Sequence, residues 1–160
     1  MIKGTLNTLG GNVPANSRGV VLLVDEDEDD RDYYSTILRA FGYEVRSCGS
    51  YEEGARLLDP GAFGLVIVSQ GSPSFEGRSV LVSATQFHRR LPVLVVARTL
   101  EMSCYLEAMQ LGAVDYLSEP IRVQDLGRAV DTHLRARAAA QKRALRADLR
   151  ERSAEAPGYP

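Results

Sequence analysis

Short apolar runs alternate with amphipathic stretches along most of the chain. The runs are continuously apolar, which is typical of strands buried on both faces of a sheet. They cover residues 20–24, 43–48, 65–68, 93–97 and 114–118. Apolar residues recur at helical spacing between these runs, and glycine or proline often ends the pattern. The predicted helices cover residues 31–41, 51–58, 78–90, 102–111 and 123 to about 152.

Two of these helices have a well-defined apolar side. We expect the following side chains to face the core: Tyr33, Ile37, Leu38 and Phe41 in the first helix, and Val80, Leu81, Ala84 and Phe87 in the third. The alternation of five strands with five helices predicts an α/β fold, a doubly wound five-stranded parallel sheet with helices on both faces.

Functional sites of doubly wound sheets lie just beyond the carboxyl ends of the strands. The topology alone therefore selects a few candidate positions before any motif is considered. They are Asp25 and Glu26 after the first strand, Ser69 after the third, Ala97 after the fourth and Glu119 after the fifth.

The chain divides into three parts. Residues 1–18 are rich in glycine, asparagine and serine, and we expect a flexible segment. Residues 19–135 form the α/β domain. Residues 136–160 are expected to form a basic helical extension that ends in a disordered tail at residues 155–160.

Composition excludes several classes of protein. The 160 residues suit one domain, 44% are hydrophobic, and the net charge of −2 gives no general attraction to nucleic acid or membranes. No stretch approaches the ~18 apolar residues of a membrane span. Cys48 and Cys104 have no CxxC spacing, so we expect two buried thiols in a reducing compartment, and a cytoplasmic protein.

Five sequence motifs in register resemble the receiver domain family of two-component response regulators. They are Val21–Asp27, Phe41–Val45, Leu65–Ser69 with Pro73 and Gly77 after it, Pro92–Ala97, and Gly112–Pro120. The resemblance spans about residues 19–135. It implies a flavodoxin-like (βα)5 fold with strand order 2-1-3-4-5.

The resemblance fails at the positions that carry the family's chemistry. In receivers, a third-strand aspartate accepts a phosphoryl group, a fourth-strand serine or threonine binds its oxygen, and a lysine before the fifth-strand proline neutralises its charge. The matching residues here are Ser69, Ala97 and Glu119. The resemblance also assigns Tyr116 to the aromatic whose rotation reports phosphorylation, and it implies a cis peptide bond before Pro120.

These replacements remove phosphoryl chemistry for physical reasons. Ser69 has no carboxylate, and its hydroxyl would need a base to become a nucleophile, whereas His88 and His133 both fall on helices away from the strand ends. Glu119 reverses a charge that is worth about 4 kcal/mol at roughly 4 Å and an effective dielectric constant of about 20. If the strands were shifted by a residue or two, Asp59 or Glu76 could instead reach the site.

Only an acidic pair remains to hold a metal. Asp25 and Glu26 could bind Mg²⁺ weakly, as a vestigial site, and no cofactor is required. Asp29, Asp30 and Asp32 suit the start of a helix, whose dipole favours acidic residues. Because no lysine lies near the acidic run, we predict that at least one of its carboxylates has a pKa above the usual value of about 4.

The last predicted helix is basic and carries a sparse apolar stripe. The basic residues are Arg128, Arg135, Arg137, Lys142, Arg143, Arg146, Arg150 and Arg152. The stripe consists of Leu126, Val130, Leu134, Ala138, Leu145 and Leu149. Three interpretations compete: a helix that dimerises, a solvated tail, and a nucleic-acid contact. The last is disfavoured, because no aromatic residue interleaves with the arginines before Tyr159.

The sequence therefore predicts a non-enzymatic pseudo-receiver, a signalling module that works without phosphorylation. We expect it to bind a protein partner or its own copy through the fourth helix, fifth strand and fifth helix. The alternatives are a receiver phosphorylated at a non-standard acceptor such as Ser69, and a DNA-associated regulator that uses the basic helix. A flavodoxin-like enzyme is disfavoured because no phosphate-binding glycine pattern follows the first or third strand.

Overall fold

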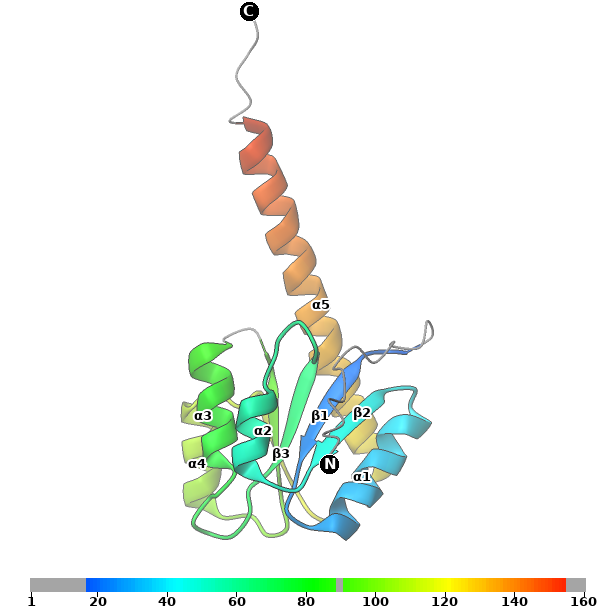
Figure 1. Ribbon diagram of the computed structural model, residues 1–160, viewed down its shortest axis with the longest axis vertical. Coiled ribbons are helices and arrows are strands. Elements are labelled where there is room, and N and C mark those ends of the chain that lie inside the picture. Colours follow the sequence, from blue (N-terminus) through cyan, green and yellow to red (C-terminus); the bar gives the residue numbers. More distant parts are fainter. Residues whose placement is uncertain (1–16, 89–90, 155–160) are drawn as a thin grey trace, which may run out of the picture.

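Five parallel strands form one sheet that is covered by helices on both faces (Figure 1). The computed structural model describes residues 17–88 and 91–154. The elements are β1 (Val20–Val24), α1 (Glu28–Ala40), β2 (Glu44–Cys48), α2 (Tyr51–Leu57), β3 (Leu65–Ser69), α3 (Arg78–Phe87), β4 (Val93–Ala97), α4 (Met102–Gln110), β5 (Asp115–Ser118) and α5 (Val123–Ala154). The strand order is β2-β1-β3-β4-β5, which confirms the predicted topology.

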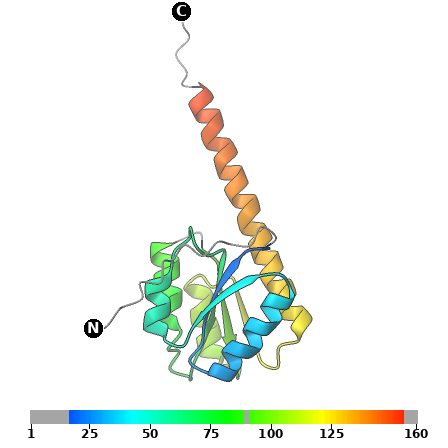
Figure 2. The same cartoon turned by 45° about the vertical axis from the view of Figure 1, so that its right-hand side comes forward.

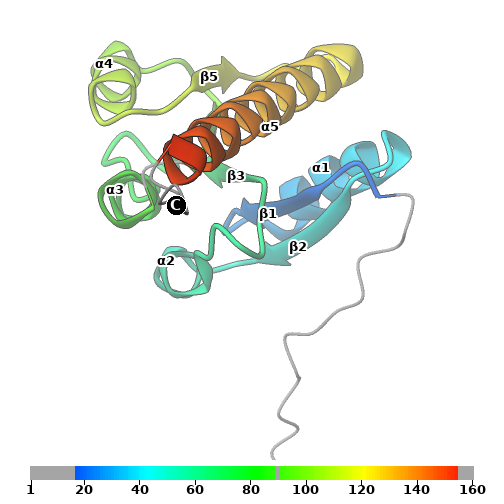
Figure 3. The same cartoon turned by 90° about the horizontal axis from the view of Figure 1, so that it is seen from above.

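The helices form two layers, one on each side of the sheet. Seen from above, α1 and α5 lie on one face, and α2, α3 and α4 lie on the other (Figure 3). Successive residues of β1 contribute to opposite cores: Leu22 packs toward α2–α4, and Leu23 packs toward α1 and α5. Both residues are fully buried, which explains why the strand sequence is continuously apolar.

Turn positions and termini largely follow the predictions. Gly42 and Gly112 have positive φ and directly follow α1 and α4, because the left-handed conformation there favours glycine. The thiols of Cys48 and Cys104 are free and buried, as predicted. Ser17 and Arg18, within the segment predicted to be flexible, are among the described residues, and Arg18 forms an ion pair with Asp131 of α5 at 2.7 Å. The predictions for residues 1–16 and 155–160 fall outside the described residues.

Two predicted core residues are exposed. Tyr33 points to solvent, and its neighbour Tyr34 is buried instead, because Tyr34 has the i, i+3, i+4, i+7 spacing with Ile37, Leu38 and Phe41. Phe87 is exposed because it is the last residue of α3. That helix was predicted to continue to residue 90, but it ends at Phe87.

The first half of α5 packs on the domain, and the second half projects away from it (Figures 1 and 2). Leu126 and Val130 are fully buried. Leu134 reaches over Gly64, where an added Cβ would lie 2.5 Å from its side chain. Arg137 is the last anchor, since its guanidinium donates to the backbone carbonyls of Phe63 and Pro60. In the described part of the chain, no helix is long and apolar enough to cross a membrane.

The loop between β3 and α3 depends on Gly77. A Cβ at this position would lie 2.0 Å from the carbonyl oxygen of Ser69, so the backbone would have to move. We predict that Gly77→Ala lowers the free energy of unfolding by about 1–3 kcal/mol, as overpacking of a closely packed site does. Urea denaturation measures this. Gly61→Ala is the matched control, because its Cβ would meet only the flexible end of Asp59 at 3.2 Å. Equal stabilities of the two variants would contradict the prediction.

Candidate functional site

A polar hollow of about 440 Å³ lies at the carboxyl ends of β1 and β3. Its lining joins the first, third and fourth strand ends with the start of α2. The residues are Asp25, Glu26, Asp27, Tyr51, Ser69, Gly71, Ser72, Glu76 and Arg98. Of the positions selected from the topology, Asp25, Glu26 and Ser69 meet in this hollow. Ala97 lies buried just behind it, and Glu119 does not line it.

Asp25 is the buried acid of the hollow. Only 4% of the residue is exposed, and its Oδ1 accepts a hydrogen bond from the backbone N–H of Asp27 at 3.0 Å. Burial raises the pKa of Asp25 to about 6, with smaller contributions from the charges of Asp30 and Asp27. The prediction of one raised carboxyl pKa is confirmed, but removal from water is the main cause and charge repulsion is secondary.

A cation that the sequence analysis missed lies at the rim. The guanidinium of Arg98, the residue after β4, contacts Asp27 Oδ2 at 2.5 Å and Asp30 Oδ2 at 2.8 Å. Asp27 also caps α1 by accepting from the Asp30 N–H, and this bond and Arg98 lower its pKa. The acidic run is therefore not without a cationic partner. The strand-end rule that selected Ala97 would have found Arg98 at the next position.

Ser69 stands at the end of β3, in the same hollow as the carboxylates of Asp25, Glu26 and Glu76. Its hydroxyl accepts a hydrogen bond from the Gly71 N–H at 3.2 Å, and no histidine is among the residues that line the hollow. Burial raises the pKa of the neighbouring Tyr51 hydroxyl to about 12, so this phenol stays protonated at neutral pH. Glu76 is held by the hydroxyl and the N–H of Ser72, which lower its pKa.

Glu119, the residue at the family's lysine position, does not line the hollow. Its carboxylate accepts a hydrogen bond from the hydroxyl of Tyr34. Both residues line a neighbouring depression with Arg98, and this places the guanidinium between Glu119 and the acidic hollow. The Glu119–Pro120 peptide bond is cis, as the resemblance implied. Asp59 lies in the turn after α2, where it caps the Gly61 N–H, and it does not line the hollow.

The ring of Tyr116 points into the core. The residue is buried, and its hydroxyl donates to the side-chain oxygen of Gln70. The ring also packs edge-on against Tyr105 of α4, with centroids 5.5 Å apart. Gln70 in turn donates to the carbonyl of Ser72 at 3.3 Å. A chain of hydrogen bonds therefore links the fifth strand to the loop after Ser69.

The residues of the hollow fit a magnesium ion poorly. Magnesium prefers carboxylates and water in octahedral geometry. In residues 17–88 and 91–154, no group of three His, Cys, Asp or Glu side chains is placed to hold a metal. Asp25 and Glu26 are two carboxylates, the third-strand position is Ser69, and Arg98 already balances Asp27. The hollow therefore does not supply the set of ligands that a magnesium ion prefers.

Comparison with known proteins decides the family. The model of the response regulator receiver domain matches residues 21–131. The chain belongs to this family. Receiver domains are signalling modules of two-component systems, and they share the flavodoxin-like fold described above.

The relatives include both receivers alone and longer regulators. Nodulation protein W of Bradyrhizobium diazoefficiens is 26% identical over 121 residues, which are 76% of this chain and 53% of that protein. The transcriptional regulatory protein FixJ of the same organism is 28% identical over 142 residues, 86% of this chain and 68% of FixJ. A crystal structure of a receiver domain from Clostridium thermocellum has a TM-score of 0.70 and 22% identity, covering 76% of this chain and 98% of that one. The chain thus spans about half of nodulation protein W, and 27% of the response regulator PilR of Pseudomonas aeruginosa.

The raised pKa of Asp25 makes stability depend on pH. The unfolded carboxyl ionises near 4 and the folded one near 6, so the folded state binds more protons between these values and stability falls as pH rises through them. We predict that Asp25→Asn removes this penalty and is about 1–3 kcal/mol more stable than the wild type at pH 7. The difference should shrink toward pH 4.

Urea denaturation at a series of pH values measures this effect. Asp29→Asn, at an exposed position of α1, serves as the control for the loss of one surface charge. If Asp25→Asn were the less stable protein at pH 7, the carboxylate would be a net stabilising group and the explanation by burial would be wrong.

Proposed function

We propose that the chain works as a phosphorylation-independent receiver, a pseudo-receiver that signals through protein contacts. The observation that carries this proposal is the pair of contacts from Arg98 to Asp27 and Asp30. They bring a fixed positive charge to the acidic rim where the family uses a metal ion. A carboxylate acceptor is lacking at Ser69, and no lysine stands at Glu119, so neither phosphoryl transfer nor retention of the product is supported.

The conformational switch of the family is fixed in this chain. In receivers, the fifth-strand aromatic moves toward a fourth-strand hydroxyl when phosphate binds. Ala97 offers no hydroxyl, and the hydroxyl of Tyr116 is already bonded to Gln70. Turning the ring outward would leave the buried Gln70 oxygen without this donor, which costs about 1–3 kcal/mol. We infer that Tyr116 stays inward without any phosphate.

The exposed face of α4 supports a docking role. It carries three exposed apolar side chains, Met102, Leu106 and Met109, and Leu100 is exposed in the loop before the helix. Met102 is 58% exposed and Leu106 is 51% exposed, and their spacing of four residues places them on the same side of the helix. We propose that a protein partner or a second copy covers this face.

The projecting part of α5 supports self-association. Leu145 and Leu149 are 60% and 54% exposed, and they follow Ala138 at spacings typical of a coiled-coil seam. A DNA contact is less well supported, because Arg135 and Arg152 are paired with Asp131 and Asp148 on the same helix. The related NtrC of Escherichia coli is described as a DNA-binding transcriptional regulator, and this chain covers 23% of it.

Phosphorylation can be tested directly. Incubated with acetyl phosphate and Mg²⁺, the chain should gain no phosphoryl group in intact-mass spectrometry, because no carboxylate stands at the end of β3. The combined variant Ser69→Asp, Ala97→Thr, Glu119→Lys restores the family residues and serves as a positive control. A phosphoryl group on an aspartate of the wild type would overturn the proposal. A phosphoryl group on Ser69 would do so too, in favour of the non-standard acceptor.

Self-association can be measured by light scattering. We predict that the full chain is a dimer. In the double variant Leu145→Glu, Leu149→Glu, negative charges of the two copies would face each other in the seam. We expect this to weaken the dimerisation affinity at least about tenfold, which corresponds to about 1.4 kcal/mol. Arg143→Glu with Arg150→Glu, two exposed changes on the same helix, tests whether any added acid has this effect. A wild-type monomer, or equal dimerisation by the leucine variant, would contradict the role of α5.

A further inference from the structure

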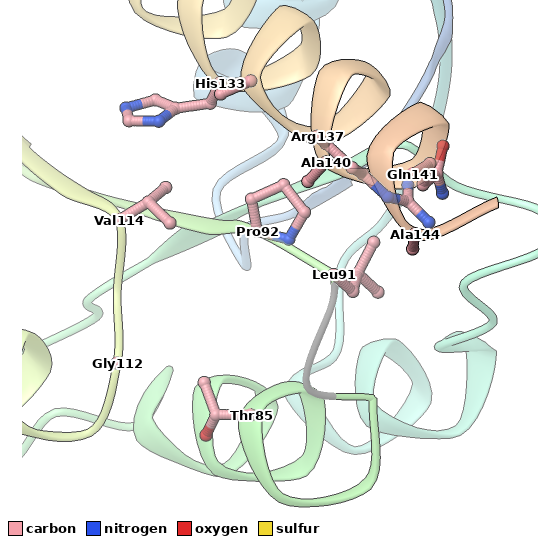
Figure 4. A pocket seen from close by; sticks show the side chains of 11 residues that line it. Thr85, Leu91, Pro92, Gly112, Val114, His133, Arg137, Ala140, Gln141 and Ala144 are labelled. Carbon is pink, nitrogen blue, oxygen red and sulfur yellow. The ribbon is translucent and has the colours of Figure 1, made fainter. Parts of the chain in front are cut away.

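A second cavity lies at the opposite end of the sheet from the acidic hollow. It has a volume of about 390 Å³, is open to solvent on one side, and lies between the root of the projecting helix and the amino ends of β4 and β5 (Figure 4). The lining residues are Thr85, Leu91, Pro92, Gly112, Val114, His133, Ala136, Arg137, Ala140, Gln141 and Ala144. None of them takes part in the acidic hollow.

The walls of this cavity are mainly apolar. Leu91, Pro92 and Val114 form the side that belongs to the sheet (Figure 4). On α5, three alanines spaced by four residues, at 136, 140 and 144, form one helical face toward the cavity. Larger side chains at these positions would reach the sheet and fill the space. The cavity therefore exists because α5 presents methyl groups here.

Arg137 brings an unbalanced charge to this apolar space. Its two terminal nitrogens donate to the carbonyls of Phe63 and Pro60, but its Nε is buried and has no hydrogen-bond partner among the described residues. Within the same part of the chain, no carboxylate lies within 4 Å of the guanidinium, whereas Asp131 and Asp148 pair with other arginines. Burial lowers the pKa of Arg137, which reflects the cost of keeping this charge away from water.

A guanidinium without a carboxylate partner, beside apolar walls, is complementary to one class of ligand. A cation would be repelled, and a neutral hydrocarbon would leave the positive charge unbalanced. A carboxylate accepts from a guanidinium readily, and an aliphatic body would cover the alanine face. Two other polar side chains line the cavity, Gln141 and His133, and the amide of Gln141 can donate a hydrogen bond to an anion. His133 lies 3.7 Å from the carboxylate of Asp115, but Asp115 itself does not line the cavity.

We propose that this cavity binds a small amphipathic carboxylate, such as a medium-chain fatty acid. The carboxylate pairs with Arg137 and Gln141, and the chain lies between Pro92, Val114 and the alanines of α5. The bound molecule contacts both the sheet and the root of the projecting helix. It therefore favours the orientation of α5 seen here, and it gives the domain a chemical input that is independent of the acidic hollow and of the function proposed above.

The proposal predicts a mapped, saturable response. Titrating octanoate into the ¹⁵N-labelled full chain should shift the amides of residues 91, 112–114 and 133–144, and leave those around Ser69 unchanged. Octanol, which has the same chain without the charge, should bind at least about tenfold more weakly, because it leaves the guanidinium without a charged partner.

Variants separate the cavity from general charge effects. Ala140→Phe fills the space and should abolish the shifts, while Arg137→Gln should weaken octanoate to the level of octanol. Arg146→Gln removes an exposed charge of the same helix outside the cavity and should bind octanoate like the wild type. Thermal melting of each variant without ligand verifies that it is folded. If Arg137→Gln loosens the attachment of α5, Ala140→Phe still tests whether octanoate binds in the cavity.

Three results would overturn the proposal. The first is the absence of saturable shifts with octanoate. The second is equal affinity for octanol and octanoate, which would make the cavity an apolar space without an anion site. The third is undiminished binding by folded Ala140→Phe, which would place the ligand elsewhere on the domain.

Discussion

The contact of Arg98 with Asp27 and Asp30 is the interaction on which the account of the acidic site depends. It ties the loop after β4 to the first turn of α1 across the mouth of the hollow. The pair is partly exposed, so its strength is modest and will fall with salt. Arg98 lines the same hollow as Asp25 and Glu26, so its guanidinium adds a positive charge to a group of carboxylates.

The residues at the family's other polar positions make local contacts of their own. Glu119, at the family's lysine position, accepts a hydrogen bond from the hydroxyl of Tyr34. With no fourth-strand hydroxyl, Tyr116 bonds to Gln70. At these two positions the fold keeps the shape of a receiver, and the side chains are held by hydrogen bonds within the domain.

Sequence reasoning predicted the fold well and the site only in part. The two helical layers and the long α5 follow from the periodicity of apolar residues and from topology, because strands buried on both faces leave a clear apolar pattern. The strand order followed from the resemblance to receiver domains. The helical spacing of Ile37, Leu38 and Phe41 favours Tyr34 over Tyr33 as the fourth core residue of α1, and the sequence prediction missed this signal. The sequence could not give the direction of the Glu119 side chain or the reach of Arg98, since long polar side chains choose partners from elements distant in sequence. The cavity beside α5 was also invisible, because alanines in a helix indicate helix formation and say nothing about the space in front of them.

The most direct test of the central claim is an NMR titration of the full chain with Mg²⁺ and beryllofluoride, which mimics a metal-bound phosphoryl group. The account predicts that the amides of Ser69, Ala97 and Tyr116 keep their positions at millimolar concentrations of both, because Arg98 holds the rim and no carboxylate ends β3. A saturable shift at Ser69 that also moves Tyr116 would contradict it, since the site would then still bind the family's ligands and transmit their binding to the fifth strand.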